Sequence, residues 1–514
     1  MALVAPIGGI QMTKNFNIYT AIVYASAKPH IGNTYEVILA DVIARYKRLA
    51  GYKVYFQTGT DEHGEKIEKK AIENGKDPQV YVDEQALEIR KVWDAVNASY
   101  DKFVRTTNQQ HKEKVAAIFK KLYNQGDIYK DYYEGLYCIP CESFWTKNQL
   151  IDEKCPDCQR EVKKVREEAY FLRLSKYAEK LEKHIADNPN FILPESRKNE
   201  LIKQFIKPGL EDLCVSRTSF NWGINVPFDE KHIIYVWIDA LSNYITFSGY
   251  DSEGENQFEN RWPADVHVIG KDIVRFHAIY WIIILMALEL ELPKTILGHP
   301  WVLIGDDKIS KSKGNVVYAD ELVQRYSVDA VRHYLLSQIS FNNDGIFTHD
   351  LFVEKTNANL ANNLGNLLNR TLTMVEKYYG GVVPNQEIKE SEFQEKIIKI
   401  DKEVIDDLDN YHVAKAIEKT FIIFDLANKY IEEMAPWHLA ENDRKMLNTV
   451  IYNLVEAIRH GAVLLQCFIP DTAEKIFDQL NVYNKSLDSL KDFKGIDEGI
   501  KINKGEVLFQ KIEC

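Results

Sequence analysis

The chain lacks a hydrophobic run long enough to cross a bilayer. Its longest apolar stretch covers residues 279–288 and stops at Glu289, whereas a transmembrane helix needs about 20 apolar residues. Residues 1–15 also lack the basic start and apolar stretch of a secretory signal, and we leave this N-terminal extension unassigned. We therefore expect a cytoplasmic protein that does not span a membrane, with a buried helix at 279–288.

Positive charge is not in excess either. Lysine and arginine together number 64 against 76 aspartates and glutamates, which leaves a net charge of −12. This balance argues against a uniformly basic nucleic-acid-binding protein. An RNA partner would need local basic surface, and the short pairs Lys69-Lys70, Lys120-Lys121 and Lys163-Lys164 are more often only solvated faces.

Cysteine is scarce, but four of the seven cysteines form two Cys-x-x-Cys pairs, Cys138 with Cys141 and Cys155 with Cys158. Each such turn directs two thiolates at one ion, which favours a tetrahedral zinc knuckle. Four thiolates leave no coordination position for a reacting water, so the ion would be structural. The alternative is a redox-active or structural disulfide pair, which the absence of a secretory signal disfavours.

The N-terminal part of the sequence has a βαβ pattern. An apolar strand at 16–25 breaks at Lys28-Pro29, a helix then runs to a glycine cap at Gly51, and a second strand follows at 53–58. Such a unit opens a parallel sheet of the kind that binds nucleotides.

Later segments are expected to complete this fold. Strand patterns at 232–237 and 266–270 are each followed by a helical pattern, and we expect both strands to join the parallel sheet. From residue 352 onward apolar residues recur at helical spacing, which predicts a helical bundle. A final strand is expected at 506–512.

Two motifs carry the candidate chemistry. His30-Ile-Gly-Asn33 stands where the first strand breaks and a helix begins, so a ring nitrogen, a side-chain amide and backbone N–H groups are expected to face one anion site. Lys308-Ile-Ser-Lys311-Ser312 is a loop with two mobile lysines. Either motif alone is more often a chance match or solvated surface, but their order, separation and context together favour a nucleotide site.

The two motifs resemble the HIGH and KMSKS signatures of class I aminoacyl-tRNA synthetases, with Asn33 in place of a histidine and Ile309 in place of a methionine. Synthetases for leucine, isoleucine and valine carry a long editing insertion that 514 residues could hardly hold. A cysteinyl enzyme should place its zinc ligands around the amino-acid site. The blocks that are similar to methionyl-tRNA synthetases are Thr20–Tyr24, Gly59–Gly64, Tyr235–Ala240 and Ile269–His277.

This resemblance implies a methionine–tRNA ligase. Such an enzyme activates L-methionine with ATP to methionyl-adenylate and transfers the methionyl group to the 3′ end of tRNA(Met), releasing pyrophosphate and AMP. Magnesium would arrive with ATP. Asn33 can donate a hydrogen bond although it never carries charge, so we expect activity to survive that departure. The residues implied for catalysis and ATP binding are His30, Asn33, Lys308 and Lys311, joined in ATP binding by Gly270 and Asp272.

The methionine pocket is implied in the same way. A thioether is apolar and polarizable, so tryptophan, tyrosine and isoleucine walls suit it. The plain alternatives are that these aromatics are ordinary core, that His277 is a hydrogen-bonded core histidine, and that Asp61, expected to bind the substrate ammonium, is a helix N-cap. The positions assigned to methionine are Ile22, Tyr24, Asp61, Trp237, Ala240, Leu241, Tyr244, Ile273, His277 and Trp281.

The resemblance also implies two contacts with tRNA. The knuckle insertion would lie near the acceptor end, with Arg217 coupling it to the pocket; the alternative for Arg217 is a surface ion pair. Asn359 and Trp437 match positions that read the CAU anticodon by edge hydrogen bonds and stacking, although Trp437 could simply be a packed helix-start residue. Many relatives place an arginine four residues after this asparagine, where Asn363 stands here, so the reading of the wobble base stays open. No appended OB-fold module is visible, and we expect a monomer.

The expected fold class is α/β: a nucleotide-binding, Rossmann-like parallel-sheet catalytic domain, split by the zinc-knuckle insertion and followed by an α-helical bundle. A competing interpretation is a catalytically silent paralogue that only binds RNA, for which Asn33 and Ile309 are the only support. The expected divisions are 16–123 and 226–300 for the two catalytic halves, 124–225 for the connective insertion, 301–355 for the KMSKS loop and stem-contact region, and 356–514 for the helical anticodon-binding domain.

Overall fold

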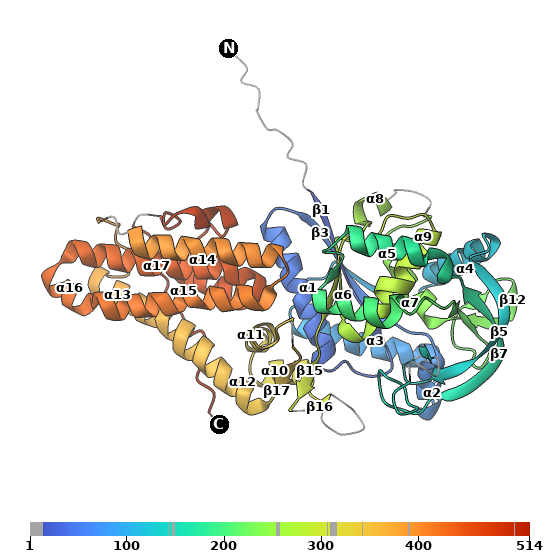
Figure 1. Ribbon diagram of the computed structural model, residues 1–514. Helices are drawn as coiled ribbons and strands as arrows, with labels where there is room; N and C mark the ends of the chain where they lie inside the picture. Colours follow the sequence, from blue (N-terminus) through green and yellow to red (C-terminus); the bar gives the residue numbers. More distant parts are fainter. Residues whose placement is uncertain are drawn as a thin grey trace, which may run out of the picture.

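A computed structural model describes residues 14–513, except 142, 146–149, 253–256, 306, 309–315, 342, 389–390 and 498. Three regions follow one another across the molecule: a helical bundle, a central parallel sheet with its helices, and an antiparallel sheet at the far side (Figure 1). This arrangement confirms the expected α/β class with a C-terminal helical bundle. Among the residues that the model describes, no helix is both long and apolar enough to cross a membrane.

The central sheet has seven strands in the order β2-β3-β1-β13-β14-β8, with β4 beside β3. Every neighbouring pair runs parallel. The carboxyl ends of these strands therefore meet at one edge, which is where α/β sheets bind ligands. The strands are β1 (Asn15–Thr20), β2 (Val23–Tyr24), β3 (Lys53–Asp61), β4 (Lys102–Arg105), β8 (Ile192–Leu193), β13 (Val266–Gly270) and β14 (Ile296–His299).

The expected βαβ unit is present as β1, α1 (Ile31–Leu49) and β3. The helix ends before Gly51, whose φ of +85° suits glycine because it has no Cβ. The expected strand at 16–25 is divided, because β1 pairs with the first part of β3 whereas β2 pairs with its end. The other helices near this sheet are α2 (Glu65–Glu73), α3 (Pro78–Ala95), α4 (Gln109–Asn124), α7 (Val236–Thr246), α8 (Phe258–Arg261), η4 (Lys271–Ile273), η5 (Phe276–Trp281) and α9 (Ile282–Ala287).

A long antiparallel hairpin forms the outer sheet. β5 pairs with β7 from Ile128 to Tyr137, and the short β6 and β9 lie at the two sides. The elements are β5 (Ile128–Cys138), β6 (Ser143–Trp145), β7 (Lys163–Leu172), η2 (Ser175–Tyr177), α5 (Ala178–Asp187), α6 (Glu195–Leu201), η3 (Ile202–Ile206) and β9 (Leu213–Cys214).

The expectation that 232–237 joins the parallel sheet is wrong. Residues 229–234 form β12 (Asp229–Ile234), which pairs antiparallel with β10 (Ser216–Arg217) and β11 (Asn225–Val226). The parallel sheet instead takes its edge strand β8 from residues 192–193, within the range expected for the insertion. A short apolar run does not indicate whether its partner strand is parallel or antiparallel. The sequence pattern therefore could not distinguish a place in the parallel sheet from antiparallel pairing with β10 and β11.

A third small sheet and two helices connect the catalytic region to the bundle. The sheet consists of β15 (Val302–Ile304), β16 (Asp307–Lys308) and β17 (Gly345–Phe347), and the helices are α10 (Ala319–Arg325) and α11 (Val328–Gln338). The bundle contains α12 (His349–Lys355), η7 (Thr356–Gly365), α13 (Asn366–Tyr379), α14 (Ser391–Asp409), α15 (Val413–Met434), α16 (Pro436–Asn442), α17 (Arg444–Phe468), α18 (Pro470–Leu480) and η8 (Leu487–Lys491).

The expected final strand at 506–512 is also wrong. No strand is assigned there among the described residues. The extended segment is held by a side chain instead, because Asn357 donates to the Ile512 carbonyl at 2.9 Å and accepts the Ile512 N–H at 2.8 Å. An extended sequence pattern predicts a strand only where a partner strand is available.

A buried ion pair joins the central sheet to the bundle. Arg332 on α11 donates to Asp41 on α1 at 2.7 Å, and both side chains are fully buried. Its other N–H groups donate to the carbonyls of Phe468 and Val96. Burial would raise the pKa of Asp41, but the charges of Arg332 and Arg45 outweigh it and lower that pKa.

Candidate functional site

One cavity of about 390 Å³, called the main cavity here, lies at the carboxyl edge of the parallel sheet. It collects residues from β1–β2, α1, β3, α7 and the segment after β13, which come from distant parts of the sequence. The predicted residues that line it are Ile22, Tyr24, His30, Asn33, Asp61, Trp237, Ala240, Leu241, Tyr244, Gly270, Asp272, Ile273 and His277.

His30 and Asn33 form the start of α1. His30 Nδ1 accepts the Gly32 N–H at 3.1 Å, and the His30 N–H donates to Asn33 Oδ1 at 3.2 Å, a reciprocal capping box. Because Nδ1 accepts, a neutral ring carries its proton on Nε2, and Asn33 retains its amide N–H groups as donors. The backbone N–H groups of His30 and Gly32 serve this cap, so the expectation that they face an anion is not met.

Gly270 and Asp272 form the opposite wall. A Cβ added at Gly270 would lie 2.8 Å from Asp272 Oδ1, so a larger residue there would displace the Asp272 carboxylate. Asp272 Oδ1 also accepts the indole N–H of Trp301 at 3.0 Å. The hydrogen bond from Trp301 therefore orients the Asp272 carboxylate, and the absence of a side chain at Gly270 leaves room for it.

Sequence reasoning missed two further polar residues of the main cavity, Glu36 on α1 and His299 at the end of β14. His299 Nε2 lies 3.1 Å from Glu36 Oε2, and its Nδ1 donates to the Pro300 carbonyl at 2.8 Å. Burial raises the pKa of Glu36. One signal could have found Glu36, because it follows Asn33 by three residues and so shares its face of α1.

The apolar end of the main cavity contains a hydrogen-bonded pair, Tyr244 and His277. His277 Nδ1 lies 3.0 Å from the Ile273 carbonyl, which can only accept, so Nε2 accepts the Tyr244 hydroxyl at 2.7 Å. Burial lowers the pKa of His277 to about 4, which keeps the ring neutral. Trp281 is fully buried and lies behind Tyr244, with ring centroids 5.7 Å apart, so it supports the wall without lining it.

Asp61 lies at the end of β3 and faces the main cavity. The alternative that it caps the next helix is wrong, because the N-cap of α2 is Gly64 and has no side-chain cap. Lys66 was missed by sequence reasoning; it lines the same cavity with its ammonium 5.2 Å from the Tyr24 ring centroid.

Sequence reasoning also missed a buried group next to the main cavity. It consists of Asp239, His63 and His111 and is called the Asp239 network here. Asp239 Oδ2 lies 2.7 Å from His63 Nδ1 and Oδ1 lies 2.8 Å from His111 Nε2, and all three residues are buried. His111 Nδ1 continues to Thr246 Oγ1 at 2.7 Å. The network joins the end of β3 to α7, which supply different walls of the main cavity.

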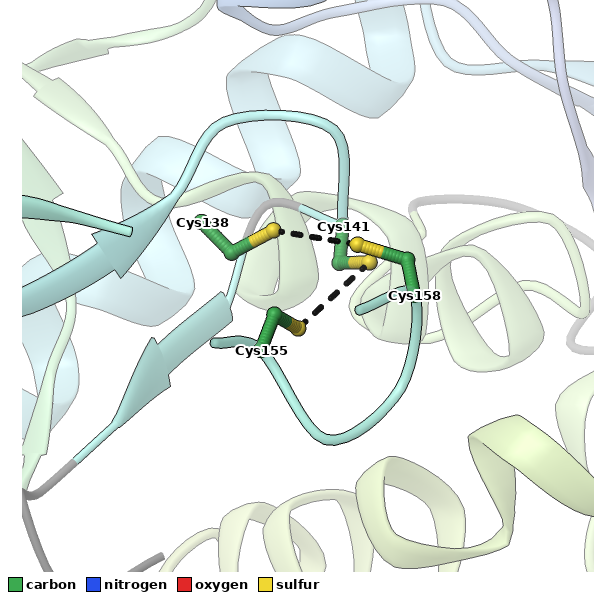
Figure 2. Close-up of side chains that lie close together, drawn as sticks. All are labelled: Cys138, Cys141, Cys155 and Cys158. Atoms are coloured by element: carbon green, nitrogen blue, oxygen red, sulfur yellow. Dashed lines mark hydrogen bonds between the residues drawn. The ribbon is translucent and has the colours of Figure 1, made fainter. Parts of the chain in front are cut away.

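The four predicted zinc ligands gather at one point (Figure 2). Their sulfur atoms all lie within 4.8 Å of one another, with Cys138 to Cys158 at 3.5 Å and Cys155 to Cys141 at 3.9 Å. Zn–S bonds of about 2.3 Å in a tetrahedron put sulfur atoms about 3.8 Å apart, so the cluster fits one zinc ion. All four cysteines are free thiols, which contradicts the disulfide alternative.

The cysteine cluster borders the main cavity. Cys141 and Cys158 line it, together with Pro140, Ser143 and Asp157. A structural ion at the cluster would therefore fix part of the cavity wall.

Arg217 is buried, so the alternative of a surface ion pair is wrong. Its guanidinium lies 3.9 Å from the ring centroid of Tyr137, the residue before Cys138. It thus contacts the strand that leads into the cysteine cluster.

The second motif is only partly described. Lys308 belongs to β16, where it pairs with Leu303 of β15. Its side chain and all of Lys311 lie outside the described residues. The roles of these lysines therefore stay predictions.

The two predicted anticodon readers lie far apart in the bundle. Asn363 bonds Asp425 and Arg370 bonds Glu432, so the helices of residues 363–370 and 425–432 run in the same direction. Asn359 lies before Asn363 in the first of these segments, and Trp437 lies after Glu432 in the second. At a helical rise of 1.5 Å per residue, Asn359 and Trp437 are therefore roughly 20 Å apart along the bundle.

Asn366 is nearer to Trp437 along the bundle than Asn359 is. Asn366 is exposed on α13 and lies one helical turn before Arg370. Asn366 and Arg370 have the Asn-x-x-x-Arg spacing that Asn359 and Asn363 lack, and Arg370 contacts Glu432, five residues before Trp437. Trp437 is 41% exposed at the start of α16, at the end of the bundle away from the parallel sheet (Figure 1), so it is not packed core.

The parallel sheet, the capped helix start at its carboxyl edge, the inserted cysteine cluster and the helical bundle define the class of class I aminoacyl-tRNA synthetases. A family model described as "tRNA synthetases class I (M)" matches residues 16–167 and 160–372, and one described as "Anticodon binding domain of methionyl tRNA ligase" matches residues 380–514. The chain belongs to the methionyl-tRNA synthetase family.

Similar proteins agree with this assignment. The chain is 53% identical to the methionine–tRNA ligase of Clostridium tetani over 97% of this chain and 79% of that protein. It is 47% identical to the methionine–tRNA ligase of Bacillus subtilis over 98% of this chain and 79% of that protein. A solved structure of Mycobacterium tuberculosis methionyl-tRNA synthetase in complex with methionyl-adenylate is similar with a TM-score of 0.92 and 37% identity, over 97% of this chain and all of that one.

Proposed function

We propose that this chain is a methionine–tRNA ligase that forms methionyl-adenylate from L-methionine and ATP and then esterifies the 3′ end of tRNA(Met). The observation that carries the proposal is that the main cavity joins two unlike ends. One end holds the capped helix start with His30 and Asn33, and the other holds the Tyr244–His277 pair among apolar walls. Family membership supports the same reaction.

In the first step the methionine carboxylate attacks the α-phosphorus of ATP and pyrophosphate leaves. No protein nucleophile is needed, so catalysis consists of positioning and of stabilising negative charge on the phosphate oxygens. His30 donates from Nε2 and Asn33 from its amide, each to a phosphate oxygen. Lys308 and Lys311 neutralise the leaving pyrophosphate, and magnesium arrives with ATP.

The methionine pocket recognises both the ammonium group and the side chain of its substrate. Asp61 binds the ammonium group. The side chain lies among Ile22, Trp237, Ala240 and Leu241, where a polarizable thioether gains dispersion and sulfur–aromatic contacts. Because the Tyr244 hydroxyl donates its one hydrogen bond to His277, its oxygen can only accept hydrogen bonds from a ligand in the cavity.

One zinc ion held by the four thiolates has a structural role in this proposal. The thiolates fill its four positions, so it activates no water. With the ion bound, the four thiolates would hold the loops that carry Cys141 and Cys158 in place as a wall of the main cavity. Arg217, stacked on Tyr137, couples this wall to the antiparallel strands beside α7.

The bundle binds the anticodon of tRNA(Met). We propose that the CAU triplet binds along the surface of the bundle that carries Asn366, Arg370 and Trp437, with Trp437 stacking on one base. Asn359 lies farther along the bundle and would contact a neighbouring nucleotide.

The proposal is tested by ATP–pyrophosphate exchange with magnesium and each of the twenty amino acids in turn. Exchange with methionine alone is expected, because the pocket is apolar and closed by a neutral polar pair. Exchange with a different amino acid would overturn the pocket assignment. The absence of exchange with all twenty would favour the RNA-binding paralogue without activity.

A further inference from the structure

The loop between β2 and α1, residues 25–30, is held by a segment that lies far along the sequence. The Lys28 ammonium is 2.8 Å from Asp320 Oδ2 and 3.5 Å from Glu321 Oε1, both on the first turn of α10. It also lies 4.4 Å from the ring centroid of Tyr318, the residue before that helix. We call these four residues the Lys28 clasp. None of them lines the main cavity.

A backbone hydrogen bond adds a second contact, on the other side of His30. Ile31 is the first residue of α1, and its N–H donates to the Val317 carbonyl at 2.9 Å. The first N–H groups of a helix have no partner within the helix, and the cap described above uses those of His30 and Gly32. Residues 317–320 therefore contact the chain both before and after His30.

Pro29 makes the connection from Lys28 to His30 short and stiff. Proline fixes its own φ and restricts the residue before it, so few rotatable bonds separate the anchored lysine from the His30 backbone. The loop has no helix or strand of its own. Its contacts must therefore keep the His30 ring in place, and a displacement of about 1 Å can slow a reaction by about 10²-fold.

The clasp is charged and only partly exposed. Burial would lower the pKa of Lys28, but Asp320 and Glu321 raise it, so the ammonium stays protonated. The side chains of Lys28 and Asp320 are 27% and 23% exposed. An ion pair near the surface usually contributes little to overall stability. Its loss can therefore disturb His30 without unfolding the protein.

We propose that Lys28 is a positioning residue for adenylate formation, which holds the His30 donor in place through Asp320 on α10. This inference rests on the proposed function. In this role Lys28 acts through its partner and does not touch methionine or ATP. The clasp also ties the first motif to the chain segment that follows the second motif in the sequence.

The test compares variants of the clasp with the parent in methionine-dependent ATP–pyrophosphate exchange. Lys28→Met is similar in length but cannot form the ion pair. Its kcat is expected to fall about tenfold, because a loosely held donor is lost mainly in the transition state. The methionine KM should stay within about twofold, and the thermal unfolding temperature should not change. Lys28→Arg keeps the charge and is expected to restore most of the rate.

Removal of the carboxylates tests whether Lys28 acts through them. Asp320→Asn is combined with Glu321→Gln, so that the second carboxylate cannot replace the first. This carboxylate variant should lose about as much kcat as Lys28→Met, and adding Lys28→Met to it should cause no further loss, since the residues act as one unit.

Lys91→Met is the matched control. Lys91 forms an ion pair with Glu88 at 2.7 Å on α3, and neither residue lines the main cavity. This variant is expected to exchange at the parent rate.

A parent kcat in folded Lys28→Met would overturn the proposal. A slow Lys28→Met beside a carboxylate variant of parent rate would also overturn it, because the lysine would then act on the phosphates itself. Loss of kcat together with lower thermal stability and a raised methionine KM would leave Lys28 a merely structural role, against the proposal. A parent protein without methionine-dependent exchange would instead overturn the proposed function, so the two failures are distinguishable.

Discussion

Two buried polar networks of similar chemistry lie in different regions of the molecule. In the catalytic region, Asp239 binds the rings of His63 and His111. In the bundle, Glu456 binds Arg459 and is 3.5 Å from His460, whose Nδ1 is 2.7 Å from Asp401. All these side chains are almost completely buried.

The networks differ in what they hold. The Asp239 network joins the loop after β3 and the start of α4 to α7, and the nearby residues Asp61 and Ala240 line the main cavity. The bundle network joins α14 and α17 to residues 489–496, none of which lines a cavity described above. Burial of charged groups therefore says little about function; the neighbouring residues decide whether a network shapes a site or only holds helices together.

The largest expected effect concerns the bundle. Arg459→Met removes the bonds to Glu456 and Ser489 and leaves Glu456 buried beside His460 without its main partner. Breaking a buried pair in this way costs about 3–5 kcal/mol. Urea unfolding of the bundle should show this loss, while methionine-dependent exchange at low temperature should stay at the parent rate.

The double variant Glu456→Gln with Arg459→Met is the matched control. Glutamine can still accept the Ile496 N–H, which donates to Glu456 Oε1 at 2.7 Å, and no uncompensated charge remains. It should regain much of the lost stability. A cost below about 1 kcal/mol for Arg459→Met alone would mean that the bundle does not depend on this network.

The second-largest effect is expected in the catalytic region. His30→Ala removes the Nε2 donor and the helix cap together, so adenylate formation should slow by about 10²–10³-fold and stability should fall by about 1 kcal/mol. His30→Asn keeps a good cap residue but lacks the ring donor. It should slow the reaction as strongly without the stability loss, as measured by exchange rates and thermal unfolding.

If His30→Asn formed adenylate at the parent rate, the phosphate role would belong to other groups. The pair of variants thus separates the cap from the chemistry at a single position.

A smaller effect is expected at the end of the bundle. Trp437→Ala should slow aminoacylation about tenfold by removing one base-stacking surface, with no change in exchange. Phe421 gives a contrast, because it is buried core of the same bundle and its loss should lower stability. Trp437→Ala with normal aminoacylation would remove the anticodon role from this residue.

Local and remote features differed in how well they could be predicted. The βαβ unit at 16–60 and the cysteine cluster follow from short-range periodicity and spacing, and both were predicted. The direction of β12 and the state of 506–512 depend on distant partners, and both predictions were wrong. The Asp239 network could not be predicted, because His63, His111 and Asp239 meet only after the sheet has formed.

The smallest expected effect tests whether the Asp239 network shapes the methionine pocket. Asp239→Asn keeps the shape but removes the charge that both rings contact. The methionine KM should rise about fivefold to tenfold, equivalent to about 1–1.4 kcal/mol, because the β3 and α7 walls are less firmly joined. The KM for ATP should not change, since His30 and Asn33 lie on α1. Thr246→Val removes only the outer partner of His111 and should have a smaller effect.

The pH dependence sharpens this last comparison. Burial would raise the pKa of Asp239, but the charge of His63 and the hydrogen bonds from both histidines lower it to about 2. A carboxyl group whose pKa is lower in the folded protein than in the unfolded chain stabilises the fold at pH values above its usual pKa of about 3.9. This stabilisation is lost as the pH falls through the lowered pKa of the folded protein. Between about pH 5 and 8 Asp239 is therefore ionised throughout, and the KM ratio of Asp239→Asn to parent should be constant. A ratio that changes across this range would mean that a group titrating there, and not the charge of Asp239, controls the pocket.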